Sequence, residues 1–242
     1  MPLEFPMAPV ATRVADLNAR FALHGATAVL EHALSDPMVG RMAMVSSFGA
    51  ESVALLHMLS VIDRKVPVIF LDTEMLFDET LTYQAQVAAH LGLSDVRIIR
   101  PDRDHMFLRD GEATLHRANP DACCALRKAE PLTRALAPFD AWITGRKRYQ
   151  GGARRALAFF EADGPHIKVN PLAHWTRGDV ADYITNNRLP RHPLVARGFA
   201  SLGCAPCTAT VAADEDARAG RWRGTEKAEC GIHFLNGKVQ RG

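Results

Sequence analysis

The chain has 242 residues, of which 48% are hydrophobic, and a formal net charge of +2. This length suits one large α/β domain or a domain with an appendage, with enough apolar residues for a core without disulfides. The nearly balanced charge does not by itself indicate a nucleic-acid partner, and the longest apolar runs are too short to span a membrane. The N-terminus lacks the pattern of a signal peptide, so we expect a reducing, cytoplasmic environment.

Helical spacing of apolar residues over residues 11–34 predicts one or two helices. Residues 41–62 read as a strand, a Ser/Gly turn and an amphipathic helix, and VPVIFLDT (66–73) reads as a strand buried on both faces. A helix ending near Gly92 and a third strand at 96–101 follow.

Further along the chain, residues 140–147 and 166–172 read as two more strands. The stretch 176–189 reads as a helix with a threonine cap. Strands that alternate with helices predict parallel pairing in an open, doubly wound sheet. In such sheets ligands bind beyond the carboxyl ends of the strands, where most of the polar motifs fall.

We expect one α/β domain over residues 1–208 and an exposed, partly mobile tail over 209–242. The apolar helical N-terminus leaves self-association into a homo-oligomer open.

The stretch SSFGAES places Ser46, Ser47, Gly49 and Ser52 between a strand and a helix. A glycine turn, serine hydroxyls and a helix N-terminus together form an anion site. The stretch lacks the Gly-Lys-Ser/Thr ending of a Walker A loop. The alternative is an ordinary helix N-cap with a glycine in the turn.

Two further strand ends carry polar residues. The basic stretch GRKRYQGGARR (145–155) follows a predicted strand and favours a second anion contact, the alternative being a solvated basic loop. In LDTEMLF (71–77), Asp72, Thr73 and Phe77 follow another strand and could hold a base and a ribose.

Four cysteines, Cys123, Cys124, Cys204 and Cys207, form a Cys-Cys pair and a distant Cys-x-x-Cys. They can converge on one metal centre. Adjacent ligands are unusual for zinc and easier to accommodate on a cubane cluster, so the spacing leans toward the cluster and leaves zinc open. Four unrelated buried thiols are the alternative.

The fifth cysteine, Cys230, lies near Lys227 and His233 and downstream of three arginines. Positive neighbours favour the thiolate, which is the nucleophilic form. The alternative is an incidental exposed thiol.

Together SSFGAES, LDTEMLF, CCALRK, GRKRYQ, LGCAPCT and ECGIH, spread from about residue 40 to 234, resemble the assimilatory adenylylsulfate (APS) reductases of the phosphoadenylylsulfate reductase superfamily. The resemblance implies an adenine-nucleotide α-hydrolase-like (PP-loop) fold with helices on both faces of a mostly parallel sheet. It also implies reduction of APS to sulfite and AMP with electrons from thioredoxin or glutaredoxin.

The resemblance also implies roles for individual residues. Cys123, Cys124, Cys204 and Cys207 would ligate a [4Fe–4S] cluster, Lys128 would lie between cluster and substrate, and Cys230 and His233 would be catalytic. The substrate-binding residues would be Ser46, Ser47, Gly49, Ser52, Thr73, Leu76, Gly145, Arg154, Arg218 and Arg221.

Two departures from the family pattern matter. The serine expected after Gln150 is replaced by Gly151, which leaves the choice between Arg154 and Arg155 open, with Arg154 favoured. The GAES turn differs from the GGxDS of ATP pyrophosphatases, which fits a member that does not split ATP. No Cys-x-x-Cys remains outside the cluster set, so we expect an external electron donor.

The expected chemistry is attack of the Cys230 thiolate on APS, which forms an S-sulfonated enzyme that thioredoxin resolves. The closest alternative is a phosphoadenylylsulfate (PAPS) reductase, which uses the same tail cysteine and typically lacks the cluster. A PP-loop RNA-thiolation enzyme and a cluster-bearing redox sensor are alternatives of other classes.

Overall fold

The computed structural model describes residues 8–212, 214–224 and 227. Its centre is a six-stranded sheet in the order β3-β2-β1-β4-β6-β5. All neighbouring strands run parallel except β5, which is antiparallel to β6. The strands are β1 (Met42–Val45), β2 (Val68–Leu71), β3 (Val96–Ile99), β4 (Ala141–Ile143), β5 (Phe160–Asp163) and β6 (His166–Val169).

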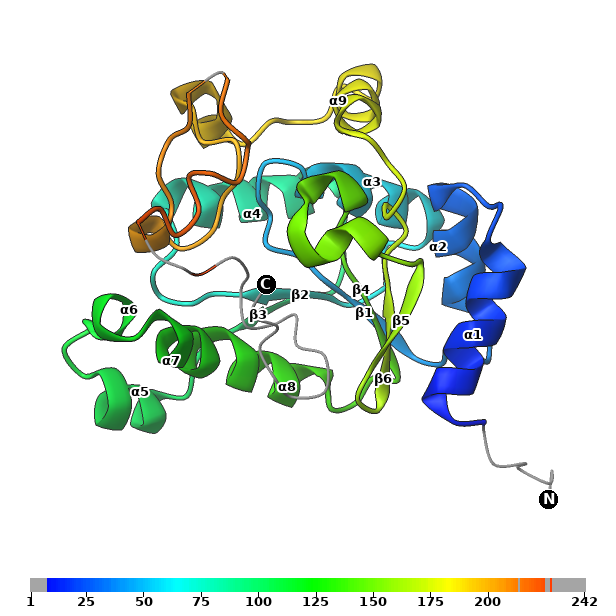
Figure 1. Ribbon diagram of the computed structural model, residues 1–242, viewed down its shortest axis with the longest axis horizontal. Coiled ribbons are helices and arrows are strands. Elements are labelled where there is room, and N and C mark those ends of the chain that lie inside the picture. The colour runs from blue at the N-terminus through cyan, green and yellow to red at the C-terminus, as the bar shows by residue number, and fades with distance from the viewer. Residues whose placement is uncertain (1–7, 213, 225–226, 228–242) are drawn as a thin grey trace.

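Helices cover both faces of this sheet (Figure 1). One face carries α2 (Ala26–Ser35), α3 (Ser52–Ile62), α4 (Asp78–Leu91) and α9 (Arg177–Asn186), and α1 (Val10–Phe21) packs beside β5. The other face carries α5 (Arg103–Asp110), α6 (Leu115–Ala118), α7 (Pro120–Cys124) and α8 (Glu130–Leu136). Short turns complete the chain: a π-helical turn at Ala125–Ala129 and 3-10 turns at Arg148–Gln150, Gly152–Ala156, Pro193–Arg197 and Ala205–Cys207.

The burial of the central strands follows from their composition. Met44, Val68 and Ile143 are almost completely buried, and α3 packs Leu55 and Leu56 against them from one side. On the opposite face a smaller cluster includes Leu132 and Leu136 of α8. Strands buried on both faces are expected to be continuously apolar, which is how their sequences read. The predicted doubly wound, mostly parallel fold is confirmed.

Two predicted helix ends are also confirmed. Gly92 ends α4 in the left-handed conformation, with φ 64°. Thr176 caps α9: its Oγ1 accepts a hydrogen bond from the Asp179 amide at 3.1 Å, and an Asp179 carboxylate oxygen accepts one from the Thr176 amide at 2.7 Å. Reciprocal capping of this kind satisfies amides that the first helical turn leaves unpaired.

The sequence analysis did not identify the edge strand β5. Gly164, with φ 60°, lies in the tight turn that joins it antiparallel to β6. The side-chain amide of Asn18 in α1 binds both backbone groups of Phe160, accepting from its N–H at 3.0 Å and donating to its C=O at 2.8 Å. The helix therefore covers polar backbone groups that an edge strand would otherwise expose.

The segment after residue 208 is more folded than we expected. Residues Thr208 and Arg221 form a β-bridge, and the Trp222 amide donates to the Cys207 carbonyl at 3.0 Å. Trp222 itself is buried, so this part of the expected exposed tail packs onto the domain. The division at residue 208 stays a prediction. Among the described helices, none has the length and apolar character needed to cross a membrane.

Candidate active site

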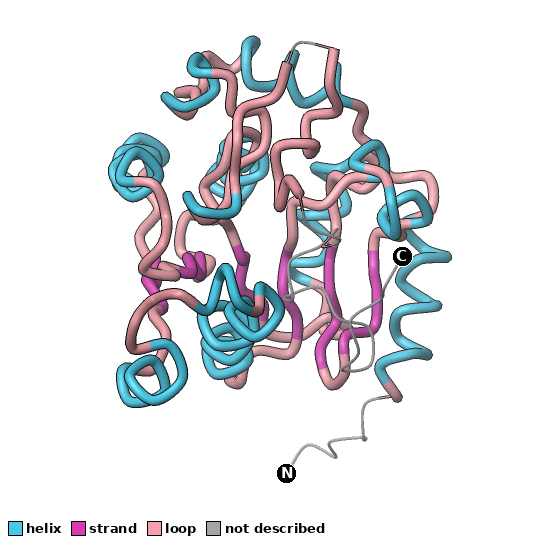
Figure 2. The backbone as a smooth tube through the Cα atoms, turned by 60° about the vertical axis from the view of Figure 1, so that its left-hand side comes forward, coloured by secondary structure: helices cyan, strands magenta, loops and turns pink. Residues whose placement is uncertain are grey.

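A cleft of about 240 Å³ opens beyond the carboxyl ends of β1, β2 and β4. Loops gather beyond one end of the strands in Figure 2. The structure brings every residue that the resemblance assigned to substrate binding to this cleft, together with Lys128. Its walls include Ser46, Ser47, Gly49, Ser52, Thr73, Leu76, Lys128, Gly145, Arg154, Arg218 and Arg221. Asp72 and Phe77, which the strand-end pattern also suggested, are not among the cleft residues, and Asp72 pairs with Arg100 at 2.9 Å.

The serine-rich turn after β1 is built differently from our expectation. Phe48, and not Gly49, takes the left-handed conformation, with φ 47°. This backbone geometry is uncommon for a bulky residue. Phe48 is fully buried, and its ring packs edge-on against Phe70 with the centroids 5.4 Å apart. Gly49 matters for space instead, since an added Cβ would lie 3.3 Å from Ser47 Oγ. Its N–H donates to Ser52 Oγ at 3.1 Å.

An acidic residue, Glu51, lies at the start of α3 in the same cleft. Its carboxylate pairs with Lys147 Nζ at 2.7 Å and accepts hydrogen bonds from the Tyr149 hydroxyl at 2.5 Å and the Gln150 amide at 3.4 Å. Burial on its own would raise the pKa of Glu51, but the charge and hydrogen bond of Lys147 outweigh it and lower the pKa below its ordinary value. The charge of Lys147 is therefore already balanced within the protein.

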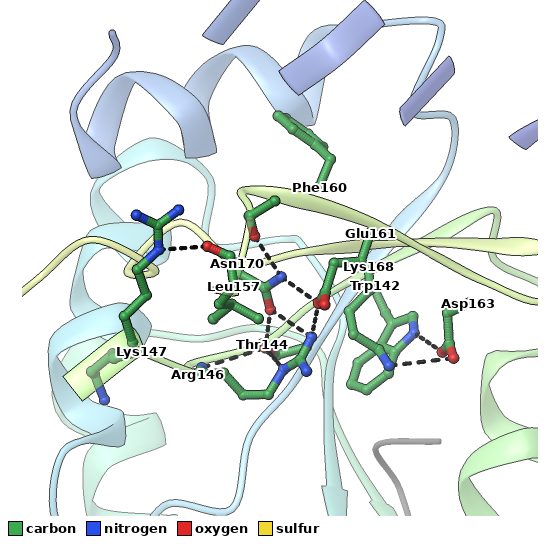
Figure 3. Close-up of polar contacts among 12 residues, drawn as sticks. Trp142, Thr144, Arg146, Lys147, Leu157, Phe160, Glu161, Asp163, Lys168 and Asn170 are labelled. Carbon is green, nitrogen blue, oxygen red and sulfur yellow. Dashed lines mark hydrogen bonds and ion pairs between the residues drawn. The ribbon is translucent and has the colours of Figure 1, made fainter. Parts of the chain in front are cut away.

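A second internal network surrounds Arg146, directly after β4 (Figure 3). The Arg146 guanidinium pairs with Glu161 and donates to Asn170 Oδ1 at 3.1 Å. Asn170 also donates to the Glu161 carboxylate at 2.8 Å and accepts from Thr144 Oγ1 at 2.7 Å. Glu161 balances the charge of Arg146, and this network links the loop after β4 to β5 and the end of β6. Arg146 also lines the cleft.

Arg154 and Arg155 differ in placement. Arg154 is buried and lines the cleft, and its guanidinium donates to the Gln150 side-chain oxygen. Arg155 is exposed and is not among the cleft residues. This geometry agrees with the preference for Arg154, although its role in binding an anion stays a prediction.

The segment from residue 214 to 224 forms a further wall of the cleft. The guanidinium of Arg221 lies over the Trp222 ring, 4.4 Å from its centroid, and its Nη1 donates to the Leu202 carbonyl at 2.6 Å. Arg221 Nε is buried and has no hydrogen-bond partner among the described residues.

Arg177 is a cleft residue that the sequence analysis missed. It is the first residue of α9, pairs with Asp216 at 3.8 Å, and lies over the Tyr149 ring at 5.8 Å. The sequence did contain a sign of this placement, because Arg177 follows a predicted strand closely and lies at the start of a predicted helix.

The four clustered cysteines line a separate small cavity beside the cleft. Cys123, Cys124 and Cys204 are buried and Cys207 is half-buried. Cys204 Sγ lies 3.2 Å from Thr73 Oγ1, at the end of β2. Lys128 and Trp222 line both the cleft and the cysteine cavity, so the two sites are direct neighbours.

The four thiols share one cavity, and a metal-ligand role for them stays a prediction. Burial raises the pKa of the Cys123 thiol to about 11, with the charge of Arg127 acting in the opposite direction. Among the described residues, no group of three or more His, Cys, Asp or Glu side chains is arranged to hold a metal ion. Four thiols around one cavity, with basic side chains beside them, do fit a cluster in which each thiolate binds a different iron.

The remaining predicted catalytic residues, Cys230 and His233, lie outside the described residues. Lys227 is described: it pairs with Asp121 of α7 and lies 6.0 Å from the centroid of the Trp222 ring. Lys227 is therefore held beside the helix that carries Cys123 and Cys124.

In open, mostly parallel α/β sheets, ligands bind in the cleft beyond the carboxyl ends of the strands, which is where this cleft lies. Residues 41–210 match the phosphoadenosine phosphosulfate reductase domain, and the chain belongs to this family.

Three similar proteins illustrate the match. An "Adenosine 5'-phosphosulfate reductase" of Mesorhizobium japonicum is 49% identical over 93% of this chain and 89% of its own length. A "Phosphoadenosine 5'-phosphosulfate reductase" of Gloeobacter violaceus is 42% identical over 80% of this chain and 82% of its own. The crystal structure of a PAPS reductase from Candida auris, a phosphate complex, has a TM-score of 0.71 at 26% identity, covering 86% of this chain and all of that one.

Proposed function

We propose that this protein reduces APS to sulfite and AMP in cytoplasmic sulfate assimilation, with thioredoxin or glutaredoxin as external electron donor. The observation that carries the proposal is that the cleft and the four-cysteine cavity are direct neighbours. Lys128 and Trp222 line both of them. The similarity to proteins named adenosine 5'-phosphosulfate reductase, at 49% and 47% identity, supports the same substrate.

The cleft has the chemistry to bind the phosphosulfate group. Arg154, Arg218 and Arg221 line it, and so does Lys128, which also lines the cysteine cavity. Guanidinium groups can bind phosphate and sulfate oxygens through two parallel hydrogen bonds. We assign the turn from Ser46 to Ser52 to the anionic end of the nucleotide, and Thr73 and Leu76 to the adenosine.

Cys230 would carry the reaction. Its thiolate attacks the sulfur of APS, an Sγ–S bond forms, and the bond from sulfur to the phosphate oxygen breaks so that AMP leaves with the electron pair. A thioredoxin thiolate then attacks Cys230 Sγ, and sulfite leaves as a mixed disulfide forms. The second thioredoxin thiolate reduces that disulfide and regenerates Cys230. Basic residues in the cleft stabilise the negative charge on the leaving group.

A [4Fe–4S] cluster would be held by Cys123, Cys124, Cys204 and Cys207. When bound, it would supply fixed charge and rigidity beside the sulfate, because thiol chemistry of this kind needs no electron from iron. Lys128 lines both the cleft and the cysteine cavity. We assign it the position between cluster and substrate, and His233 a catalytic role in the same segment as Cys230.

The test compares sulfite release from APS and from PAPS by anaerobically purified protein with reduced thioredoxin. We expect sulfite from APS at a rate at least about tenfold above that from PAPS, which corresponds to about 1.4 kcal/mol of discrimination. Faster release from PAPS would assign the protein to the PAPS reductases, and release of pyrophosphate from ATP would favour an RNA-thiolation enzyme. Iron content without sulfite from either nucleotide would favour a redox sensor.

A matched variant separates binding from chemistry. Cys230→Ser should retain iron and AMP binding while ending turnover, because only the nucleophile is lost. Full activity in this variant would contradict the covalent route while leaving the choice of substrate intact.

A further inference from the structure

Beneath the cysteine cavity lies a buried ion pair that the chemistry above does not use. Arg127 Nη2 and Nε donate to the same Asp110 carboxylate oxygen at 2.7 and 3.1 Å. The side chains of Arg127 and Asp110 are 3% and 1% exposed. Arg127 lines the cysteine cavity and neither residue lines the cleft, so this pair cannot touch a nucleotide bound there.

The same arginine also reaches the wall of the cleft from behind. Arg127 Nη1 donates to the backbone carbonyl of Thr73 at 2.9 Å. Thr73 lines the cleft, and its hydroxyl lies 3.2 Å from Cys204 Sγ. A continuous chain of contacts therefore runs from the helix that carries Cys123 and Cys124, through Arg127, to the cleft wall and the second cysteine pair.

Arg127 and its neighbour Lys128 lie in the same turn and both line the cysteine cavity, but only Lys128 also lines the cleft. Residues Ala125–Ala129 form a π-helical turn. Widened turns of this type commonly occur at functional sites. Arg127 is buried there, while Lys128 lines the cleft.

Asp110 keeps the guanidinium in place. Its second carboxylate oxygen accepts a hydrogen bond from the Leu115 amide at 2.8 Å, which fixes the carboxylate between α5 and α6. Burial alone would raise the pKa of Asp110, but the Leu115 amide and Arg127 lower it below its ordinary value, so the carboxylate is charged.

We propose that Arg127, fixed by Asp110, is a positioning residue that couples nucleotide binding in the cleft to the state of the four-cysteine site. The identity of the nucleotide rests on the proposed function. A nucleotide that fixes Thr73 would fix Arg127 and Cys204 through the contacts described, and binding at either site would stabilise the other. Such coupling is reciprocal and commonly amounts to a factor of five or more.

The test measures iron release from the purified holoprotein to a chelator, with and without saturating AMP. The primary variant is Arg127→Lys, which keeps the charge but cannot bridge Asp110 and Thr73 with one planar fork. The control is Arg109→Gln on the same helix as Asp110, since the Arg109–Glu130 pair, at 2.8 Å, is exposed and neither residue lines the cleft or the cysteine cavity. Asp110→Asn is the second variant, which keeps the acceptor for the Leu115 amide and removes the charge.

We expect AMP to slow iron release about fivefold in the wild type and in Arg109→Gln, and by less than about 1.5-fold in Arg127→Lys and Asp110→Asn. A residue with a purely structural role would change the basal rate of release and leave the effect of AMP intact. Equal protection by AMP in wild type and Arg127→Lys, or no protection in the wild type, would overturn the coupling.

If the purified protein carries no iron, the cluster assignment fails. The coupling is then measured through the reactivity of the Cys204 thiol. The rate of Cys204 alkylation by iodoacetamide, measured by peptide mass spectrometry, should then fall with AMP in the wild type and in Arg109→Gln but not in Arg127→Lys. An AMP effect that survives in Arg127→Lys would again overturn the inference.

Discussion

Gly203 lies directly against the guanidinium of Arg221. A Cβ added at residue 203 would lie 2.2 Å from Arg221 Nη2 and 2.4 Å from its Cζ. The atoms in conflict are the far end of a flexible side chain, so Gly203→Ala should displace the guanidinium from the cleft and leave the fold intact. We expect KM for APS to rise about tenfold, equivalent to about 1.4 kcal/mol, with little change in Tm. Steady-state kinetics and thermal unfolding of the same preparation measure both quantities.

The matched control is Gly25→Ala, because an added Cβ there meets nothing within 4 Å. This variant should keep the wild-type KM. An unchanged KM in Gly203→Ala would show that Arg221 does not bind the substrate from the position described.

The four thiols of the cysteine cavity give a second prediction. Cys207 is the most exposed of them, so Cys207→Ser should disturb the surrounding packing least. If all four are ligands, this variant should lose most of its iron and its visible absorbance while remaining folded. Iron and sulfide analysis after anaerobic purification is the measurement. Iron content equal to that of the wild type would remove Cys207 from the ligand set.

The doubly wound sheet and the walls of the cleft could be predicted because their signals are local. The strand at 66–73 is a continuous apolar run, and Thr73 at its end reaches the cleft because parallel strands place their carboxyl ends at one edge. The resemblance then assigned roles to residues that a pattern alone leaves ambiguous.

The interactions that the sequence did not reveal depend on distant parts of the chain. Glu51 and Lys147 are 96 residues apart, and nothing near either one indicates that they pair. Phe48 adopts a conformation that local preference would assign to Gly49, because tertiary burial of its ring against Phe70 outweighs that preference. Trp222 lies in a charged stretch, and its burial follows from contact with the Cys207 segment.

Glu51 and Lys147 give a prediction on stability. Lys147 is almost fully buried, whereas the Glu51 side chain is 30% exposed. Glu51→Gln leaves a buried cation without its acid partner, and we expect a loss of about 2 kcal/mol, below the cost for a fully buried pair. For a chain of this size that corresponds to a fall in Tm of roughly 4–8 °C. Thermal unfolding without nucleotide measures it.

The double variant Glu51→Gln/Lys147→Met is the control for this charge effect. It removes the uncompensated cation and should recover part of the lost stability. A double variant less stable than Glu51→Gln would indicate that Lys147 stabilises the fold through contacts other than this pair.

His192 gives a prediction on pH. Its Nδ1 accepts from the Leu194 amide at 3.2 Å, and its Nε2 lies 3.1 Å from Thr80 Oγ1. Burial lowers the pKa of His192 from 6.5 to about 4, against a smaller opposing effect of Glu79. The unfolded chain therefore binds the proton more readily, and stability should fall as the pH drops from about 6.5 toward 4.

The urea midpoint at pH 7 and at pH 5 measures this effect. His192→Asn keeps an acceptor for the Leu194 amide and cannot titrate, so its midpoint should change less between the two pH values. An equal change in the two proteins would assign the pH dependence to other groups.

The central claim is that Cys230 accepts the sulfonate group from APS. The most direct test is the intact mass of the anaerobically purified protein after mixing with APS and no reductant, with PAPS in a parallel sample. The account predicts a sulfonate adduct that maps to Cys230, forms with APS, is absent in Cys230→Ser, and is released as sulfite by reduced thioredoxin. A folded, metal-loaded protein that forms no adduct with either nucleotide would contradict it.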